Sequence, residues 1–203
     1  MDFLSAHWLD ITTTVLGLAY ILLEVRVSLW LFLVGFVMEV LDVVLYYDAG
    51  LYADFGMEFY YIAMTIYGFV HWSSRKDATR HGEESDKERG PDKTELPVTH
   101  FPRRYILPWA AGTIGLWLLI WWLLVRFTDS TVPMADSFTT AFSVVGAWAL
   151  ARKYIEQWGI WIAVDVVCCV LYATKGLPFK SALYGLYVVL AIWGYVKWRR
   201  IIA

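Results

Sequence analysis

The stretch Leu45–Trp72, LYYDAGLYADFGMEFYYIAMTIYGFVHW, recurs 126 residues later as Leu171–Trp198, LYATKGLPFKSALYGLYVVLAIWGYVKW. The two stretches align without a gap, and most of the identical positions are aromatic residues or glycines. The identical residues are Leu45, Tyr46, Gly50, Leu51, Tyr61, Ile66, Gly68, Val70 and Trp72, which meet Leu171, Tyr172, Gly176, Leu177, Tyr187, Ile192, Gly194, Val196 and Trp198. Upstream, the same offset pairs Glu39 with Asp165 and Arg26 with Arg152. The sequence therefore predicts an internal repeat.

The chain around this repeat is too apolar for a soluble domain. Of its 203 residues 59% are hydrophobic and 18% are charged, and the mean hydropathy is +0.52. A soluble domain averages about 45–50% apolar and 25% charged residues. Apolar runs close to the roughly 20 residues that span a bilayer recur along the chain, and we expect an all-α polytopic membrane helical bundle. The seven expected spans are Ile11–Val25, Leu29–Tyr47, Met57–Trp72, Tyr105–Val125, Met134–Leu150, Trp158–Ala173 and Ser181–Lys197.

One long polar segment divides three spans from four. Ser73–Arg104 is rich in charged residues, with Gly and Pro, which predicts a flexible, solvated loop. The predicted organisation is a first three-helix repeat over residues 1–72, a cytoplasmic polar loop over 73–104, a linker transmembrane helix over 105–126 and a second three-helix repeat over 127–203. Because the repeats begin four spans apart, they are expected to run parallel. That is a transporter architecture with its substrate site near the midplane; the alternative is a duplicated helical scaffold without transport.

The distribution of Lys and Arg predicts the orientation. One side of the expected topology carries 14 of these residues and the other carries 3. Loops rich in Lys and Arg stay in the cytoplasm, so the N-terminus is expected outside and the C-terminus in the cytoplasm, in a bacterial cell inner membrane. Met1–Asp10 lacks a basic n-region, so no cleavable signal is predicted.

Carboxylates within or near the apolar runs are the main functional signal. Each costs about 2.5–3.5 kcal/mol at the centre of a span, and such residues normally face a bundle interior or a wet cavity. They share helix faces with aromatic rings and small residues, by the i, i+3, i+7 rule. The predicted stripes are Gly17, Tyr20 and Glu24; Glu39, Asp42 and Tyr46; Glu58, Tyr61, Thr65 and Gly68; Trp158, Trp161, Asp165, Cys168 and Tyr172; and Tyr184, Tyr187, Ala191 and Gly194.

Acids combined with rings suit a flat organic cation, because rings attract cations by roughly 0.5–2 kcal/mol per contact. The candidate substrate-binding residues are Glu39, Asp42, Tyr46, Glu58, Tyr61, Trp161, Asp165, Tyr172 and Tyr187. Gly68 and Gly194 are predicted to let helices pack closely. Other interpretations stay open: Glu24 and Asp42 could pair with Arg26 or hydrogen-bond across helices, and Glu58 could be solvated at a span end.

Several function classes have no support in the sequence. It contains no P-loop, no H-E-x-x-H and no G-x-S-x-G, so no catalytic residue is predicted. The four histidines fall outside the middle of the spans, and the neighbouring Cys168 and Cys169 do not have metal-ligand spacing, so no metal or cofactor is expected. The net charge of −2 gives no indication of nucleic-acid binding.

Three segments carry a family resemblance. Tyr52–Tyr61 (YADFGMEFYY) followed by Tyr67–Trp72 (YGFVHW) resembles the third-span signature of the PnuC family of vitamin transporters. Ala151–Asp165 (ARKYIEQWGIWIAVD) resembles the sixth-span W-x-x-W signature, and Leu171–Trp198 resembles the family's C-terminal part. The likeness covers nearly the whole chain apart from Ser73–Arg104. Two positions depart from the pattern: Phe69 stands where members usually have Trp, and Glu58 where many have Gln.

The resemblance implies a 3+1+3 bundle like that of the SWEET sugar carriers, assembled as a homotrimer in the lipid bilayer. It further implies pyridine nucleotide salvage: uptake of nicotinamide riboside by facilitated diffusion, with a cytoplasmic kinase trapping the product. Relatives carry thiamine or riboflavin. A thiamine carrier remains an alternative, because nicotinamide riboside and thiamine are both cations. A proton-coupled carrier and a non-transporting membrane scaffold also remain alternatives.

Overall fold

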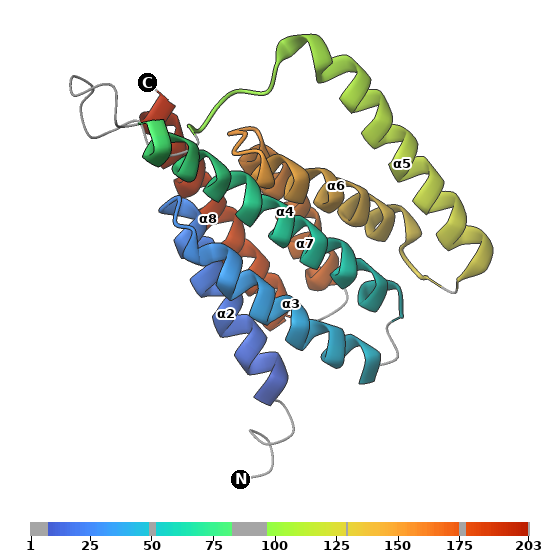
Figure 1. Ribbon diagram of the computed structural model, residues 1–203. Helices are drawn as coiled ribbons and strands as arrows, with labels where there is room; N and C mark the ends of the chain where they lie inside the picture. Colours follow the sequence, from blue (N-terminus) through green and yellow to red (C-terminus); the bar gives the residue numbers. More distant parts are fainter. Residues whose placement is uncertain (1–7, 49–51, 83–96, 129, 175–177, 203) are drawn as a thin grey trace. The chain divides into compact units, whose positions relative to one another are not determined.

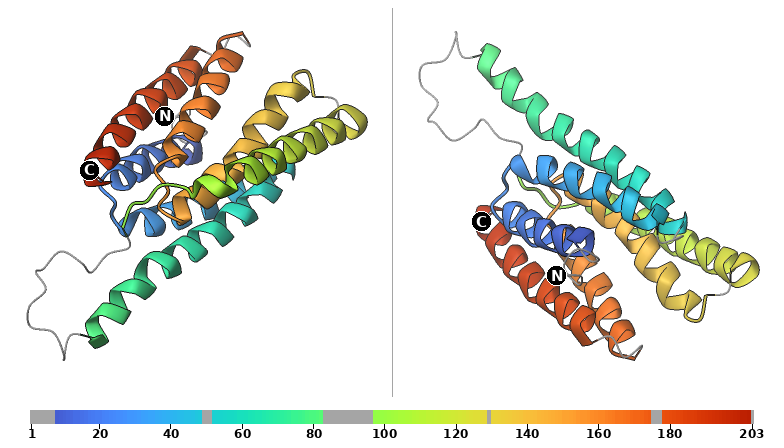
Figure 2. Two further views of the ribbon diagram at one scale, coloured as in Figure 1. Left: turned by 90° about the horizontal axis from the view of Figure 1, so that it is seen from above. Right: turned by 90° about the horizontal axis from the view of Figure 1, so that it is seen from below.

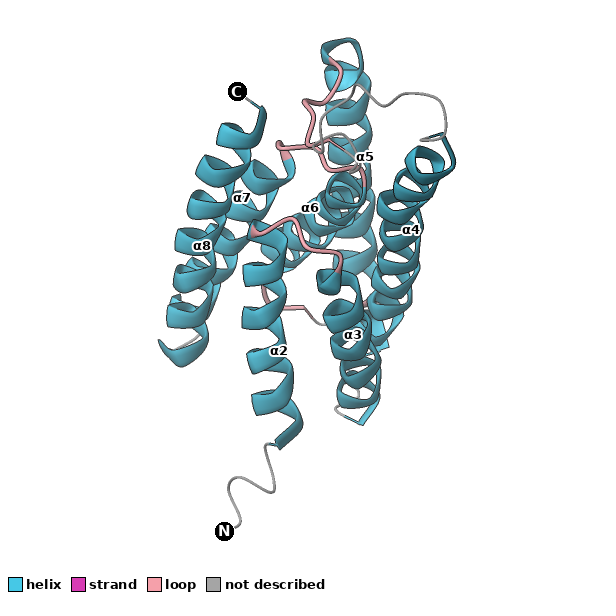
Figure 3. Cartoon of the chain, turned by 60° about the vertical axis from the view of Figure 1, so that its left-hand side comes forward, coloured by secondary structure: helices cyan, strands magenta, loops and turns pink. Residues whose placement is uncertain are grey.

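The computed structural model describes residues 8–48, 52–82, 97–128, 130–174 and 178–202 (Figure 1). Within these residues the chain forms seven α-helices and no β-strand, which confirms the all-α expectation (Figure 3). The helices are α2 (Trp8–Val25), α3 (Trp30–Asp48), α4 (Tyr52–Gly82), α5 (Ile106–Phe127), α6 (Pro133–Ala151), α7 (Gln157–Thr174) and α8 (Pro178–Ile202).

The chain divides into two compact units, Met1–Pro97 and Val98–Ala203. In the first unit α3 packs against both α2 and α4. In the second unit α5 packs on α6, α6 on α7 and α7 on α8, and the last two run side by side in Figure 2. The helices α3 and α7, which carry Glu39 and Asp165, therefore each have a helix on both sides.

Three of the described helical segments are long and apolar enough to cross a bilayer by length and composition: Trp30–Tyr47, Arg103–Phe127 and Gln157–Thr174. Thr14–Val25 is a shorter apolar segment of the same kind. The other helices fall short of this criterion, and α4 and α6 include acidic, Ser and Thr residues.

The prediction of a polar loop over residues 73–104 is wrong at the start of that segment. Helix α4 does not end at Trp72 but continues through Gly82. A helix that is already hydrogen-bonded gains one further bond for each residue it adds, so a polar composition alone does not stop it. The middle of the predicted loop, residues 83–96, lies outside the described part of the chain, as do Gly50, Leu51, Gly176 and Leu177 of the repeat alignment.

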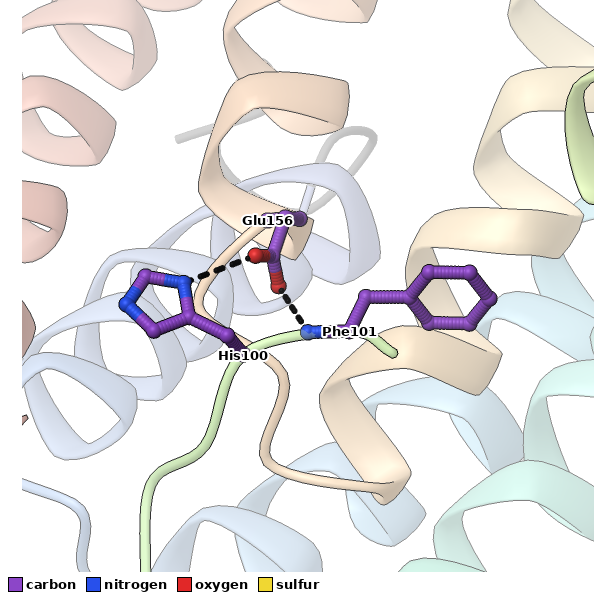
Figure 4. A network of polar contacts seen from close by, with 3 residues as sticks. All are labelled: His100, Phe101 and Glu156. Atoms are coloured by element: carbon purple, nitrogen blue, oxygen red, sulfur yellow. Dashed lines mark hydrogen bonds and ion pairs between the residues drawn. The ribbon is translucent and has the colours of Figure 1, made fainter. Parts of the chain in front are cut away.

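The end of the predicted loop is also not a free segment. Val98 is only 7% exposed, and the backbone of Thr99 forms an isolated bridge with Tyr154 in the turn between α6 and α7. Glu156 accepts a hydrogen bond from the Phe101 N–H at 2.9 Å and contacts His100 Nδ1 at 2.9 Å (Figure 4). The polar composition of the segment did not predict these contacts, because they depend on single residues such as Val98 and Phe101.

The Phe101 ring completes this attachment with edge-on contacts to three other rings. Its centroid lies 6.0 Å from that of Trp109, 6.1 Å from that of Trp148 and 5.3 Å from that of Tyr154. Trp109 and Trp148 stack on one another at 4.0 Å, which joins α5 to α6. The segment before α5 is thus held by both polar and aromatic contacts within its own unit.

Residues 126 positions apart make matching contacts in the two units. Phe32 of α3 meets Trp72 of α4 edge to face at 4.9 Å and 88°. Their counterparts, Trp158 of α7 and Trp198 of α8, meet edge to face at 5.5 Å and 89°. All four side chains are buried, with at most 4% of their surface exposed. Each ring pair therefore ties the second helix of its repeat, α3 or α7, to the following helix by the same geometry.

Candidate functional site

In the first unit a carboxylate lies buried between helices. Glu39 of α3 is 6% exposed, and its Oε1 accepts a hydrogen bond from Thr65 Oγ1 of α4 at 2.6 Å. Thr65 is itself only 8% exposed. The second oxygen, Oε2, is buried and has no hydrogen-bond partner among the described residues. One oxygen of this carboxylate thus accepts a hydrogen bond from the protein, and the other oxygen does not.

An aromatic ring from α2 lies beside the same carboxylate. A Cβ at Gly35, one turn before Glu39, would meet Tyr20 Cε2 at 2.9 Å and Thr65 Oγ1 at 3.7 Å. Tyr20 is close enough to Glu24, Glu39 and Tyr61 to interact with each electrostatically. Three helices therefore bring Tyr20, Glu39 and Thr65 together, and glycine at position 35 leaves the room for the ring.

Among the other predicted residues of the first unit, Asp42 and Tyr61 belong to this surrounding. Asp42 lies one turn after Glu39 and within electrostatic reach of it. The Tyr61 ring is 5.8 Å from that of Tyr60. Glu58 is buried at 7% exposed, so it is not solvated as the alternative interpretation had it. Glu58 and Tyr46 both make interactions within the described part of the chain.

In the second unit Asp165 occupies the position equivalent to Glu39. It lies on α7 and is 8% exposed. Cys168, one turn further, is within electrostatic reach of it. The position equivalent to Thr65 is Ala191, which is 3% exposed and cannot donate a hydrogen bond. Asp165 has no hydrogen-bond partner in the described part of this unit.

In the second unit too a ring packs on a glycine, but it comes from the other helix of the pair. A Cβ at Gly146 of α6 would meet Trp161 of α7 at 3.1 Å and 3.2 Å. Gly146 is equivalent to Tyr20, and Trp161 is equivalent to Gly35. Each unit thus packs one ring on one glycine between its first and second repeat helices, with ring and glycine exchanged.

Three further tyrosines form an aromatic cluster in the second unit. Tyr172 of α7 stacks on Tyr184 of α8 at 5.2 Å and 20°, and Tyr184 meets Tyr187 edge to face at 5.7 Å. The predicted site residues Tyr172 and Tyr187 are therefore joined through Tyr184. Ser181 adds a hydrogen bond of 2.9 Å to the Cys169 carbonyl, which fixes the start of α8 to the end of α7.

The predicted packing glycines are both buried in the helices that follow α3 and α7. A Cβ at Gly194 would lie 2.4–2.6 Å from the ring of Trp158, so glycine is needed where α8 crosses this tryptophan. Trp158 is 1% exposed. Gly68, the equivalent position on α4, is also buried. Trp158 of the W-x-x-W segment is therefore a packing residue, whereas its neighbour Trp161 is only half-buried.

The candidate site suits binding rather than chemistry on a bound molecule. No group of three or more His, Cys, Asp or Glu residues that could hold a metal ion occurs among the described residues. Buried carboxylates beside rings offer hydrogen-bond acceptors, negative potential and flat apolar surfaces. Tyr20 and Thr65 stood in the predicted stripes but not among the candidate site residues, and Gly35 and Gly146 had no signal in the sequence.

The comparisons with known proteins agree on the kind of protein. The riboflavin/roseoflavin transporter RibM of Streptomyces davaonensis is 27% identical over 196 residues, covering 94% of this chain and 84% of that protein. The nicotinamide riboside transporter PnuC of Neisseria mucosa is 26% identical over 203 residues, covering 96% of this chain and 73% of that protein. PnuC of Escherichia coli is 22% identical over 215 residues, covering 94% of this chain and 84% of that protein.

A solved structure and a family match complete the comparison. The crystal structure of the vitamin B3 transporter PnuC shares the fold, with a TM-score of 0.73 at 20% identity over 97% of this chain and 82% of that one. The family described as nicotinamide mononucleotide transporter matches residues 7–200. Because this match spans nearly the whole sequence, the chain belongs to the nicotinamide mononucleotide transporter family, whose PnuC members are membrane transporters and not enzymes.

Proposed function

We propose that this protein is a permease that takes up nicotinamide riboside by facilitated diffusion, with Glu39 and Asp165 as its cargo-binding carboxylates. The observation that carries the proposal is the burial of these two acids at equivalent repeat positions on α3 and α7, each in a unit where a ring packs on a glycine. Nicotinamide riboside combines a flat cationic ring with ribose hydroxyls. Rings and carboxylate oxygens are the groups that recognise these two features.

The buried contacts favour transport over a non-transporting scaffold. A scaffold would pair its buried acids with basic side chains, because an uncompensated charge in the bilayer is costly. In the described structure the hydrogen-bond partner of Glu39 is the Thr65 hydroxyl, and Asp165 has neither an ion pair nor a hydrogen bond. Both acids thus remain available to a cargo, which a purely structural role would not require.

The remaining details of the proposal follow the sequence predictions. The protein resides in the bacterial inner membrane with its N-terminus outside and its C-terminus in the cytoplasm, as the Lys and Arg distribution indicates. Two three-helix repeats move relative to one another during transport, and the protein assembles as a homotrimer. Thiamine is the alternative cargo because it too is a flat cation. The likeness to RibM adds riboflavin as a neutral competitor.

The test is uptake into proteoliposomes that contain the purified protein. Labelled nicotinamide riboside, thiamine and riboflavin are supplied separately, with and without a proton gradient. We expect uptake of nicotinamide riboside that stops at equal concentrations inside and outside. Preferred uptake of another vitamin would reassign the cargo, and accumulation driven by the gradient would replace facilitated diffusion with a proton-coupled mechanism.

Variants at the two acids test the site itself. Glu39→Gln and Asp165→Asn keep the side-chain size and remove the charge, and each is expected to raise the KM for a cationic cargo about tenfold or more. Glu156→Gln, which removes a carboxylate from the exposed turn before α7, is the matched control and should leave uptake unchanged. Normal uptake by both acid variants would remove the carboxylates from the proposal.

A further inference from the structure

The two oxygens of Glu39 have different surroundings. Thr65 Oγ1 donates to Oε1 at 2.6 Å, while Oε2 is buried without a hydrogen-bond partner in the described residues. Leaving a buried acceptor unsatisfied costs about 1–3 kcal/mol, and more for a charged group, so such an atom calls for an explanation. A cargo that brings an N–H or O–H group to this oxygen would supply one.

The second unit shows that the hydroxyl is not needed for packing at this position. Ala191 is equivalent to Thr65 and is 3% exposed, so a side chain without a hydroxyl packs at the same depth. Asp165, the counterpart of Glu39, consequently has no donor from the neighbouring helix. The hydroxyl therefore distinguishes one carboxylate from the other and does not serve the fold common to both repeats.

We propose that Thr65 is a positioning residue for cargo binding, and that its hydroxyl turns the Glu39 carboxylate so that Oε2 meets an N–H or O–H donor of the cargo. The inference rests on the proposed function of Glu39. A glutamate side chain has three rotatable bonds, and ordering it on binding costs free energy that would otherwise appear as affinity. Thr65 keeps the carboxylate in one orientation before the cargo arrives.

The first experiment compares Thr65→Val with Thr65→Ser in proteoliposomes. Valine has nearly the shape of threonine without the hydroxyl, whereas serine keeps the hydroxyl and loses the methyl group. We expect Thr65→Val to raise KM about tenfold, since a hydrogen bond to a charged group is lost, with a maximal rate close to that of the wild type. Thr65→Ser should rescue KM. An unchanged KM in Thr65→Val, or an equal defect in both variants, would overturn the proposal.

The second experiment is a double-mutant cycle with Glu39→Gln. If Thr65 acts through Glu39, adding Thr65→Val to Glu39→Gln should change KM by less than about twofold. Fully additive effects would show that Thr65 acts independently of Glu39 and would overturn the inference. Gel filtration of each purified variant confirms that the compared proteins are folded.

The outcomes separate this inference from the function on which it rests. A defect in Glu39→Gln together with a normal Thr65→Val supports Glu39 as a cargo-binding residue and removes only the positioning role. A normal Glu39→Gln together with a defective Thr65→Val contradicts both roles as stated. A wild-type protein that moves none of the three vitamins would overturn the proposed function first, and the positioning role with it.

Discussion

Val27 and Lys153, which lie 126 residues apart, both adopt a left-handed backbone conformation, with φ of 56° and 55°. Each residue lies two positions after the last residue of a helix, Val25 of α2 and Ala151 of α6. The same pair of hydrogen bonds closes both turns: Ser28 N to Leu23 O at 3.0 Å and Val27 N to Glu24 O at 2.9 Å, matched by Tyr154 N to Ala149 O at 3.0 Å and Lys153 N to Leu150 O at 2.8 Å. This is the Schellman pattern of helix ends, in which the left-handed position usually holds glycine.

Replacing Val27 with glycine should stabilise the protein. A β-branched residue in the left-handed region is strained by roughly 1–2 kcal/mol, and glycine relieves that strain at some cost in the entropy of the unfolded chain. We expect a net gain of up to about 1 kcal/mol, seen as a higher melting temperature of the purified protein in detergent. Lys153→Gly is the contrasting variant, because Lys153 is 2% exposed and makes interactions. Removing its side chain should lower the melting temperature. A gain at both positions would mean that backbone strain alone decides the effect.

Gly194→Ala should destabilise the crossing of α8 over Trp158. Its Cβ would lie 2.4–2.6 Å from the buried ring, and overpacking of this kind costs about 1–3 kcal/mol. Gly159→Ala is the control on α7, because a Cβ there meets nothing within 4 Å. That control should gain about 0.5–1 kcal/mol, since alanine favours the helix. Thermal melting of both variants measures the difference, and equal shifts would refute a specific contact at Gly194.

The two tryptophans of the W-x-x-W segment should have different roles, Trp158 in stability and Trp161 in cargo binding. Trp158→Phe preserves a ring where the first unit has Phe32, so we expect a stability loss of about 1–2 kcal/mol with an unchanged KM. Trp161→Leu removes the half-buried ring beside Gly146 and should raise KM roughly tenfold with a smaller effect on melting. Uptake kinetics and melting curves of the two variants test this. A raised KM in Trp158→Phe would show that the buried ring also acts on the cargo.

The attachment of the segment before α5 should depend more on Phe101 than on Glu156. Glu156 and His100 are partly exposed, so Glu156→Ala should cost at most about 1 kcal/mol. Phe101 contacts Trp109, Trp148 and Tyr154, and Phe101→Ala should cost more, about 3 kcal/mol. Amide hydrogen exchange of Thr99 and Ile155, whose backbone N–H groups are hydrogen-bonded, measures how far the segment before α5 detaches. Faster exchange in Glu156→Ala than in Phe101→Ala would reverse this ranking.

The fold class was predictable because it rests on local properties. A helix must satisfy its own backbone hydrogen bonds in lipid, so runs of apolar residues identify helices without any knowledge of their neighbours. Six of the expected spans begin and end within five residues of the observed helices, and five of these six agree within three residues. The seventh, α4, runs on through Gly82. The polar composition of Ser73–Arg104 indicates that the segment is solvated, but it does not determine whether its backbone is helical.

The sequence by itself determined the succession of seven helices, the alignment of positions 126 residues apart and the acids at Glu39 and Asp165, because spacing and hydropathy record these directly. Only the tertiary structure showed that Thr65 holds one oxygen of Glu39, that Trp158 is a packing residue, and that the ring on Gly35 comes from α2 while the ring on Gly146 comes from α7. The reason is physical: which side chain fills the space beside a glycine depends on how two helices cross. That crossing is set by packing between segments far apart along the chain.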